Sequence, residues 1–431
     1  MKPLSERSLL LLLAAVQFTH IVDFMILMPL GPQLMRELSI GPGHFSALVA
    51  AYTISSGVVG LFAAPFIDRF DRRKLLLFAY GGFLLGTLSC ALSQNATTLL
   101  AARALSGAFG GLSISMVMSI IGDVVPAERR AAGMGVVMTA FSAAAALGIP
   151  FGLQLAQYFR WEAPFFMLAA LGSVVWTIGF LRLPPVRGHL DNGESTRAFA
   201  ELLRDANAGR ALLFMIAMVF GHFVVIPLLS PYLVYNVGLP EHDLFMVYFA
   251  GGALTVFTGP RIGKLADRFG RFRVFSVLVA IACAVTLFIT HSGRLPVWAV
   301  LVAGGSFFVF ASGRFVPGQA MMTLAVPASR RGAFMSLSGC ARDVAMGITS
   351  GLGGWIVTRA PSGQLENYQW LGWIAVSASI ISVWLGSRVR VNEAGTPARK
   401  VTKGHDIAPY PVTDLVRSDR DSTRLPVDHS G

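Results

Sequence analysis

The sequence predicts an all-α membrane protein in which twelve transmembrane helices form two pseudo-symmetric six-helix bundles. Only 13% of the 431 residues are charged and 54% are hydrophobic, whereas a soluble domain carries about 25% charged residues. Apolar runs long enough to cross a bilayer as helices recur along most of the chain. Short sequences of the first half also return in the second half in the same order.

The apolar runs fall into two sets of six. The first set lies at about 9–30, 46–67, 75–93, 98–121, 132–154 and 164–183, and the second at about 211–235, 244–263, 273–291, 296–321, 333–358 and 370–388. We therefore expect an N-terminal half (1–183), a cytoplasmic linker (184–210), a C-terminal half (211–388) and a tail (389–431). The tail is rich in charge, proline and serine and has no apolar period, so we expect it to be disordered.

Basic residues gather in alternate loops, and this pattern orients the chain. The loops on one side contain Arg69, Arg72, Arg73, Lys74, Arg129, Arg130, Lys264, Arg268, Arg271, Arg273, Arg330 and Arg331. Because positively charged loops remain on the cytoplasmic side, we expect a multi-pass protein of the cytoplasmic (inner) membrane with both termini in the cytoplasm. The net charge of +12 then faces the lipid surface, and no nucleic-acid partner is expected.

Four pieces of sequence repeat between the halves at offsets of roughly 200 residues. The first-half pieces are Val125–Arg130, Asp68-Arg69-Phe70, the pair His20 and Pro29, and Arg103; they return as Val326–Arg331, Asp267-Arg268-Phe269, the pair His222 and Pro231, and Arg314. Their constant order predicts two parallel copies of one six-helix unit.

A polar strip interrupts the first apolar run. Gln17, His20 and Asp23 follow a three-residue spacing and so share one helix face. A carboxylate inside a membrane costs several kcal/mol unless it faces protein or water. Asp23 aligns with Val225 in the second copy, so the shared architecture does not require it. We hypothesise that Asp23 takes up and releases protons, with His20 as its relay or hydrogen-bond partner; the alternative is a polar interhelical clamp that never titrates.

Further charged residues lie inside the apolar runs. Arg103 and Arg314 each need a carboxylate, carbonyl groups or an anionic substrate group, and Arg314 either mirrors Arg103 structurally or binds substrate. Arg342 and Asp343 are adjacent and point about 100° apart on a helix, so we expect them to pair with different helices. Asp343 is the second candidate for the protonatable acid. The residues expected to line a substrate cavity are Gln17, His222, Arg314, Arg342 and Asp343.

Several motifs resemble those of the major facilitator superfamily. Gly263–Arg271 reads G-K-L-A-D-R-F-G-R and is similar to that family's loop motif G-x-L-a-D-R-x-G-R/K. The first-half copy, Ala64–Lys74, keeps Asp68 but has Ala64 and Asp71 where the motif has glycine. Two further stretches resemble the helix-4 motif of proton-coupled members and a shortened helix-5 antiporter motif, namely Leu99-x-x-x-Arg103-x-x-Ser106-Gly107 and Gly148-Ile149-Pro150-Phe151-Gly152.

The resemblance implies a function as well as a fold. Phe18–Met25 is similar to the bacterial drug and sugar efflux branch, which implies proton-coupled efflux of a small organic compound by alternating access, with Arg103 in proton coupling. It also implies a latch at the cytoplasmic gate, formed while the outer side is open. In this latch Asp68 meets the start of the eleventh span (333–358) near Arg331, and Asp267 meets the start of the fifth span (132–154) near Arg130. The alternative is that the basic loops only orient the chain. The residues implied in this gate are Asp68, Arg69, Arg72, Arg130, Gly263, Asp267, Arg268, Gly270, Arg271 and Arg331; those of the helix-5 motif are Gly148, Pro150 and Gly152. We expect Asp123 to pair with Arg69 or Arg72.

Other function classes remain as alternatives. A proton-coupled importer of a small metabolite has the same architecture, and so does a non-transporting membrane sensor. An enzyme is not expected, because no His/Asp/Ser constellation gathers in one place and no Gly-x-x-x-x-Gly-Lys-[Ser/Thr] stretch is present. The three cysteines lack metal-type spacing, and no metal or cofactor is expected. The expected partners of a monomer are a small-molecule substrate, protons and the lipid bilayer.

Overall fold

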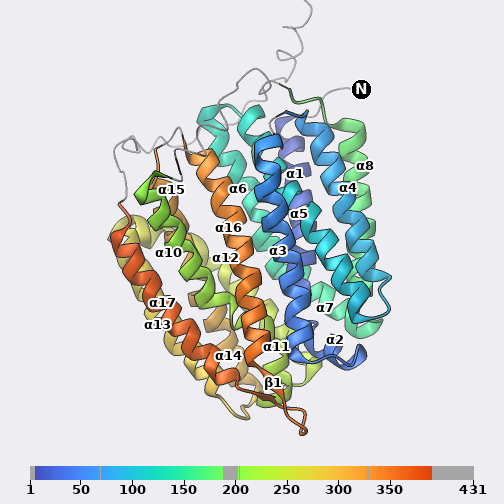
Figure 1. The fold of residues 1–431 in the computed structure, drawn as a ribbon, viewed down its shortest axis with the longest axis vertical. Coiled ribbons are helices and arrows are strands. Elements are labelled where there is room, and N and C mark those ends of the chain that lie inside the picture. The colour runs from blue at the N-terminus through green and yellow to red at the C-terminus, as the bar shows by residue number, and fades with distance from the viewer. Residues whose placement is uncertain (1–4, 68, 188–201, 203, 328–329, 391–431) are drawn as a thin grey trace, which may run out of the picture.

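A computed structural model describes residues 5–67, 69–187, 202, 204–327 and 330–390. Asp68, most of the expected linker and nearly all of the expected tail lie outside these residues. The described chain is almost entirely helical, and its long helices run along one common direction (Figure 1).

The helices follow one another with short connections. Those up to residue 182, which we call the α1–α8 set, are α1 (Glu6–Ile26), α2 (Gly31–Glu37), α3 (Pro42–Ile67), α4 (Arg72–Ala91), α5 (Ala96–Val124), α6 (Ala127–Ala143), η1 (Ala144–Gly148), α7 (Ile149–Tyr158) and α8 (Ala163–Arg182). The α10–α17 set comprises α10 (Ala206–Phe223), η2 (Ile226–Leu228), α11 (Leu229–Tyr232), η3 (Leu233–Val237), η4 (Glu241–Asp243), α12 (Leu244–Phe269), α13 (Arg271–His291), α14 (Val297–Phe307), η5 (Phe308–Ser312), α15 (Phe315–Leu324), α16 (Arg331–Ile356) and α17 (Tyr368–Arg388). Between the last two helices, β1 (Thr358–Arg359) pairs antiparallel with β2 (Leu365–Glu366).

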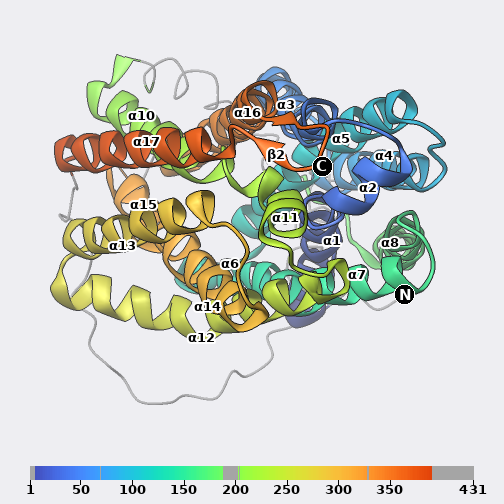
Figure 2. The same ribbon diagram turned by 90° about the horizontal axis from the view of Figure 1, so that it is seen from below.

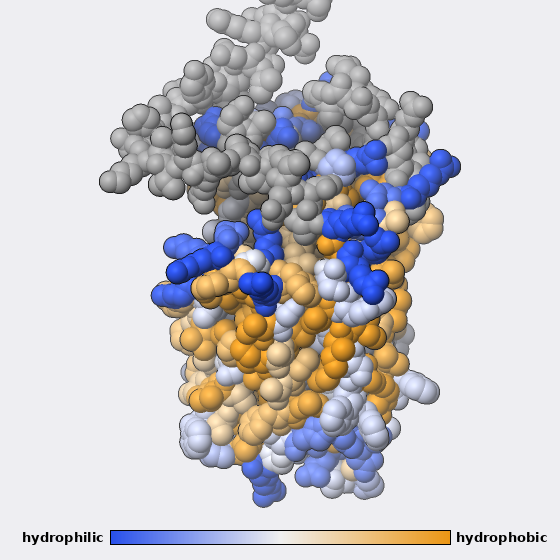
Figure 3. Space-filling model, turned by 90° about the vertical axis from the view of Figure 1, so that its left-hand side faces the viewer, coloured by the Kyte–Doolittle hydropathy of each residue, from blue (hydrophilic) through white to orange (hydrophobic). Residues whose placement is uncertain are grey.

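Ten helical stretches of the described chain are long and apolar enough to cross a membrane. The helices α12 and α16, each of 26 residues, lie in the same bundle but are not among the ten, because glycine, hydroxyl and charged residues dilute their apolar sequence. On the face shown in Figure 3, an apolar belt lies between two hydrophilic ends. The all-helical, multi-pass class is confirmed, whereas the number twelve stays a prediction.

Helix caps and interruptions follow from local sequence. Asn95 caps α5 in a capping box with Thr98, which satisfies backbone N–H groups that have no partner inside the helix. The span containing α6 and α7 is interrupted by the π-helical turn η1 directly before Pro150. Proline has no N–H to donate to the preceding turn, and π-helical turns are common at such points and at functional sites.

The two ends of the bundle differ in how the helix sets pack. We call the end with the loops after α3, α5, α12 and α15 the basic end, which is uppermost in Figure 1. There the two sets have separate cores, one including Leu13 and Ile121 and the other including Phe275 and Phe334. At the opposite end one core unites residues of both sets. Along the interface, α3 packs against α16, as the view from below also shows (Figure 2). The sets are therefore joined at the opposite end and separate at the basic end.

Candidate functional site

A buried ion pair links α1 to α5. Arg103 Nη1 lies 2.8 Å from Asp23 Oδ2, and both side chains are 0% exposed. The same nitrogen donates to the backbone oxygen of Asp23 at 3.3 Å, and Thr87 Oγ1 of α4 donates to Asp23 Oδ1 at 3.0 Å. Every oxygen of the carboxylate thus has a partner, which offsets the cost of burying its charge.

Tyr52 of α3 connects this ion pair to His20. Its ring centroid lies 4.2 Å from the guanidinium carbon of Arg103, a cation–π distance, and its hydroxyl lies 2.8 Å from His20 Nε2. The prediction that His20 hydrogen-bonds to Asp23 is therefore wrong. Although the two side chains are three residues apart, Asp23 turns to α4 and α5 and His20 turns to α3. A relay role for His20 stays a prediction.

Two glycines of α5 allow this arrangement. A Cβ atom on Gly107 would lie 2.0 Å from the backbone oxygen of Tyr52, and one on Gly110 would lie 2.6 Å from His20 Nε2. Glycine at both positions therefore allows α3 and α1 to approach α5 closely. Sequence reasoning missed Tyr52 and Thr87; the available signal was a polar group inside an apolar run.

The α10–α17 set repeats the arginine but not its carboxylate. Arg314, 1% exposed, donates to Ser379 Oγ at 2.7 Å and to the backbone oxygen of Met218 at 3.3 Å. Among the described residues it has no carboxylate partner. His222 packs its ring against Phe307 with a centroid distance of 5.3 Å, and within the described part of the chain it has no charged partner. Each arginine thus donates to a carbonyl of the first helix in its set, but only Arg103 has an acid.

Arg342 and Asp343 form a second ionic group on α16. Arg342 Nη2 lies 3.0 Å from Asp343 Oδ1, so the prediction that the two pair with different helices is wrong. The long arginine side chain folds back and spans the 100° between neighbouring positions. Ser56 Oγ of α3 donates to Asp343 Oδ2 at 2.7 Å. The Asp343 carboxylate therefore joins the two helix sets. Gln17, in contrast, is buried, and its Oε1 has no hydrogen-bond partner among the described residues.

Comparisons with known proteins agree with this architecture. The sequence profile of the Major Facilitator Superfamily matches residues 13–313 and 213–420. The chain belongs to the Major Facilitator Superfamily. It is therefore a multi-pass membrane protein of a transporter family and not an enzyme.

Three relatives and structures illustrate the likeness. The chain is 22% identical to the uncharacterized MFS-type transporter YceJ of Bacillus subtilis (strain 168), over 79% of this chain and 87% of YceJ. It is 32% identical to the uncharacterized MFS-type transporter YhcA of the same organism, over 40% of this chain and only 32% of YhcA. The nucleoside transporter NupG has the same fold, with a TM-score of 0.69, 11% identity, and coverage of 88% of this chain and 99% of that chain.

Other superfamily relatives are also matched over part of their length. The uncharacterized MFS-type transporter YwfA of Bacillus subtilis (strain 168) is 26% identical over 60% of this chain and 63% of its own. The chain thus spans less than two thirds of the length of YhcA and YwfA.

The superfamily loop motif lies at the basic end. In the second copy, Gly270 has φ +94°, a conformation that favours glycine. In the first copy, Asp71 stands at this place with φ −56° and caps α4 by accepting from the N–H of Arg73 at 2.9 Å. The departure from glycine therefore replaces a left-handed turn with a helix cap. Burial raises the pKa of Asp71, but hydrogen bonds from Arg187 and from backbone N–H groups outweigh it and hold the pKa below its usual value.

Of the two predicted latch contacts, that of Asp267 with the Arg130 region is not formed, and that of Asp68 lies outside the described residues. The pairing of Asp123 with Arg72 is confirmed, with Nε to Oδ2 at 3.0 Å. The Asp267 side chain is 72% exposed and lies 3.6 Å from Arg271, with no contact to Arg130 among the described residues. Because the latch is predicted for the state that is open at the other end, it stays a prediction. The remaining gate residues lie at the ends of α3, α12 and α16, namely Arg69, Gly263, Arg268 and Arg331.

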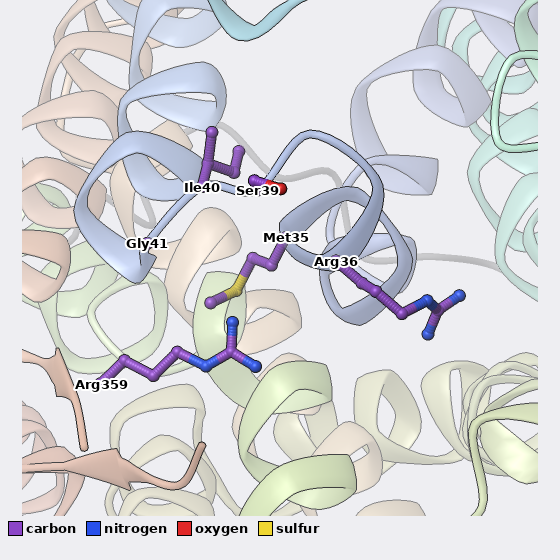
Figure 4. A pocket seen from close by; sticks show the side chains of 6 residues that line it. All are labelled: Met35, Arg36, Ser39, Ile40, Gly41 and Arg359. Carbon is purple, nitrogen blue, oxygen red and sulfur yellow. The ribbon is translucent and has the colours of Figure 1, made fainter. Parts of the chain in front are cut away.

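The opposite end is closed by contacts between the two helix sets. Arg36 of α2 forms an ion pair with Glu241, and the Glu241 hydrogen bond raises the pKa of Arg36. Tyr235 donates its hydroxyl to the backbone oxygen of Pro32 at 2.9 Å. Beside them lies a shallow depression of about 420 Å³, lined by Met35, Arg36, Ser39, Ile40, Gly41 and Arg359. Figure 4 shows Arg359 extending toward Met35 while Arg36 points away.

The motif Gly148–Gly152, which lies at the junction of η1 and α7, packs against α1. A Cβ atom on Gly148 would lie 2.4 Å from Val22 Cγ2, and one on Gly152 would lie 2.8 Å from Ile26 Cδ1. Pro150 lies between them at the start of α7. These residues therefore position α1, which carries Asp23, against η1 and α7.

Proposed function

We propose that this superfamily member is a proton-coupled secondary transporter that exports a small organic compound by alternating access. The single observation that carries the proposal is the ion pair of Asp23 with Arg103, fully buried inside a membrane-spanning set of helices. The equivalent position in the second half is Val225 and has no acid. A buried acid present in one half alone is a candidate for a group that changes its charge during transport.

The proposed architecture has twelve spans in two halves, residues 1–183 and 211–388, with α12 and α16 completing the ten apolar spans. Separate cores at the basic end and a shared core at the opposite end support two bodies that rock about their interface. The basic end faces the cytoplasm in this proposal. The described conformation is then open toward the cytoplasm and closed on the outer side.

Proton uptake would act through the residues around Asp23. When the carboxylate is protonated, Arg103 loses its one carboxylate partner among the described residues. The guanidinium then keeps the backbone oxygen of Asp23 and the ring of Tyr52 as partners. Tyr52 stacks on Phe24, whose ring centroid lies 6.4 Å from that of Phe223 in the other half. A change in charge at Asp23 is thus connected through Arg103, Tyr52 and Phe24 to the interface that must move.

The test is transport into proteoliposomes with an imposed pH gradient, run across a panel of small organic compounds. We expect gradient-dependent transport in the wild type, and its loss in Asp23→Asn. Glu162→Gln is the control, because it removes a carboxylate whose ion pair with Arg160 lies outside the site, and it is expected to keep gradient dependence. If Asp23→Asn does not fold, the double variant Asp23→Asn/Arg103→Gln removes both charges together.

Two results would contradict the proposal. One is gradient-driven transport in Asp23→Asn at the wild-type rate. The other is a proton-linked uptake that occurs in whole cells but not in inverted vesicles, which would make the protein an importer.

A further inference from the structure

Arg342 is a charged side chain that is exposed at the middle of a membrane helix. It is the twelfth of the 26 residues of α16, about 16 Å from the start of that helix at the basic end. Its side chain is nevertheless 45% exposed. A charge at this depth is expensive unless it faces water or a polar ligand.

The guanidinium faces the interface between the helix sets, not the outer surface. The outward face of α16 is marked by the exposed side chains of Ile348 and Trp355, which lie about 120–140° around the helix from Arg342. Its neighbour Asp343 binds Ser56 of α3, the helix whose Tyr52 hydroxyl binds His20 of α1. Arg342 therefore stands where a compound crossing between the halves would pass.

The charges at this place favour an anion. Nε and Nη2 of Arg342 both bind Asp343 Oδ1, so Nη1 has no hydrogen-bond partner among the described residues. The second oxygen of Asp343 accepts from Ser56, so both carboxylate oxygens already have a donor. Of the charged groups described above, the three arginines Arg103, Arg314 and Arg342 are matched by only two aspartates. Among the described residues Arg314 donates to a hydroxyl and a carbonyl and has no carboxylate partner. One positive charge in excess remains for a ligand to neutralise.

We propose that the transported compound is a small organic anion whose charged group binds the guanidinium of Arg342. A carboxylate, sulfonate or phosphate oxygen is the acceptor that arginine N–H groups bind most strongly. The apolar part of the compound would lie against Phe24, which is partly buried and packs against all three hydrophobic cores. This inference deepens the proposed function and rests on it for the step of transport.

The local potential is measured at a cysteine placed beside Arg342. Gly339 lies one turn away on the same helix, and a Cβ atom there meets nothing within 4 Å. Gly339→Cys is introduced into the full-length protein after Cys90, Cys283 and Cys340 are replaced by alanine. Its rates of modification are measured with the anionic sulfonatoethyl and the cationic trimethylammonioethyl methanethiosulfonate reagents, each relative to its rate with free cysteine.

We expect the normalised rate for the anionic reagent to exceed that for the cationic one by several-fold. Arg342→Gln should abolish this preference and Arg342→Lys should keep it, since lysine retains the charge. A preference for the cationic reagent, or an anionic preference that survives Arg342→Gln, would overturn the inference.

The proteoliposome screen supplies the second readout. Each carboxylate in the panel is paired with its uncharged amide and with the amine of matched size, and only the carboxylates are expected to be transported. Gradient-driven transport of amines or amides alone would refute the anion inference and leave proton coupling standing. Transport of carboxylates that ignores the pH gradient would refute proton coupling and leave the anion site standing.

Discussion

Removing one partner of the Asp23–Arg103 pair is expected to destabilise the protein strongly. Both side chains are 0% exposed, and their closest atoms are 2.8 Å apart. In Asp23→Asn the amide oxygen can still accept from Thr87, but no negative charge remains opposite the buried guanidinium. Breaking a buried pair from one side costs about 3–5 kcal/mol, which corresponds to a loss of two to four powers of ten in the folding equilibrium constant.

The double variant Asp23→Asn/Arg103→Gln separates the pair from its surroundings. Because neither charge is then left alone, its loss of stability should be smaller than the sum of the two single losses by about 2–3 kcal/mol. The free energy of unfolding is measured by denaturant titration of the purified protein in detergent micelles. If the single losses add to within about 0.5 kcal/mol, the two side chains do not interact and the reasoning about this site is refuted.

Two further predictions concern packing and pH. Gly107→Ala should lower the free energy of unfolding by about 1–3 kcal/mol, because its Cβ would lie 2.0 Å from the backbone oxygen of Tyr52. Gly122→Ala is the control and should cause no loss, because its Cβ would meet nothing within 4 Å. Equal melting temperatures for the two variants would contradict the close approach of α3 to α5. The pKa of Asp71 is held below its usual 3.8, so its contribution to stability is complete above that value and is lost as the pH falls through the lower folded-state pKa. Asp71→Asn should therefore show a smaller loss of stability below pH 3.8 than the wild type, and Arg187→Gln should act in the same direction; identical acid unfolding curves would contradict this.

The sequence predicts which polar and charged side chains lie inside the helical bundle more reliably than it predicts which groups they contact. Asp23 and Arg103 were both singled out as charges inside apolar runs, yet nothing in the sequence paired them, because helical periodicity gives a direction around one helix and not the identity of the neighbouring helix. The same limit explains why His20 was assigned to Asp23 and not to Tyr52. The glycines of α5 were visible as a motif, but their use became clear only when the backbone of α3 was found against them.

The prediction that the adjacent residues Arg342 and Asp343 pair with different helices is wrong for a different reason. The argument that Arg342 and Asp343 point about 100° apart is sound for Cβ atoms, but a four-bond arginine side chain can fold back on its neighbour. The conformational state was also beyond the sequence. In the proposed mechanism the exposed Asp267 and the closed opposite end belong to one of two states, and motifs do not specify which state is populated.

The most direct test of proton coupling at Asp23 is the ratio of substrate accumulated by proteoliposomes as the pH gradient is varied at zero membrane potential. For each proton exchanged, the wild-type ratio should change about tenfold per pH unit. In the Asp23→Asn/Arg103→Gln variant we expect a ratio that does not depend on the gradient, while substrate exchange across the membrane continues. A variant whose ratio follows the gradient as steeply as the wild type would show that protons are coupled elsewhere.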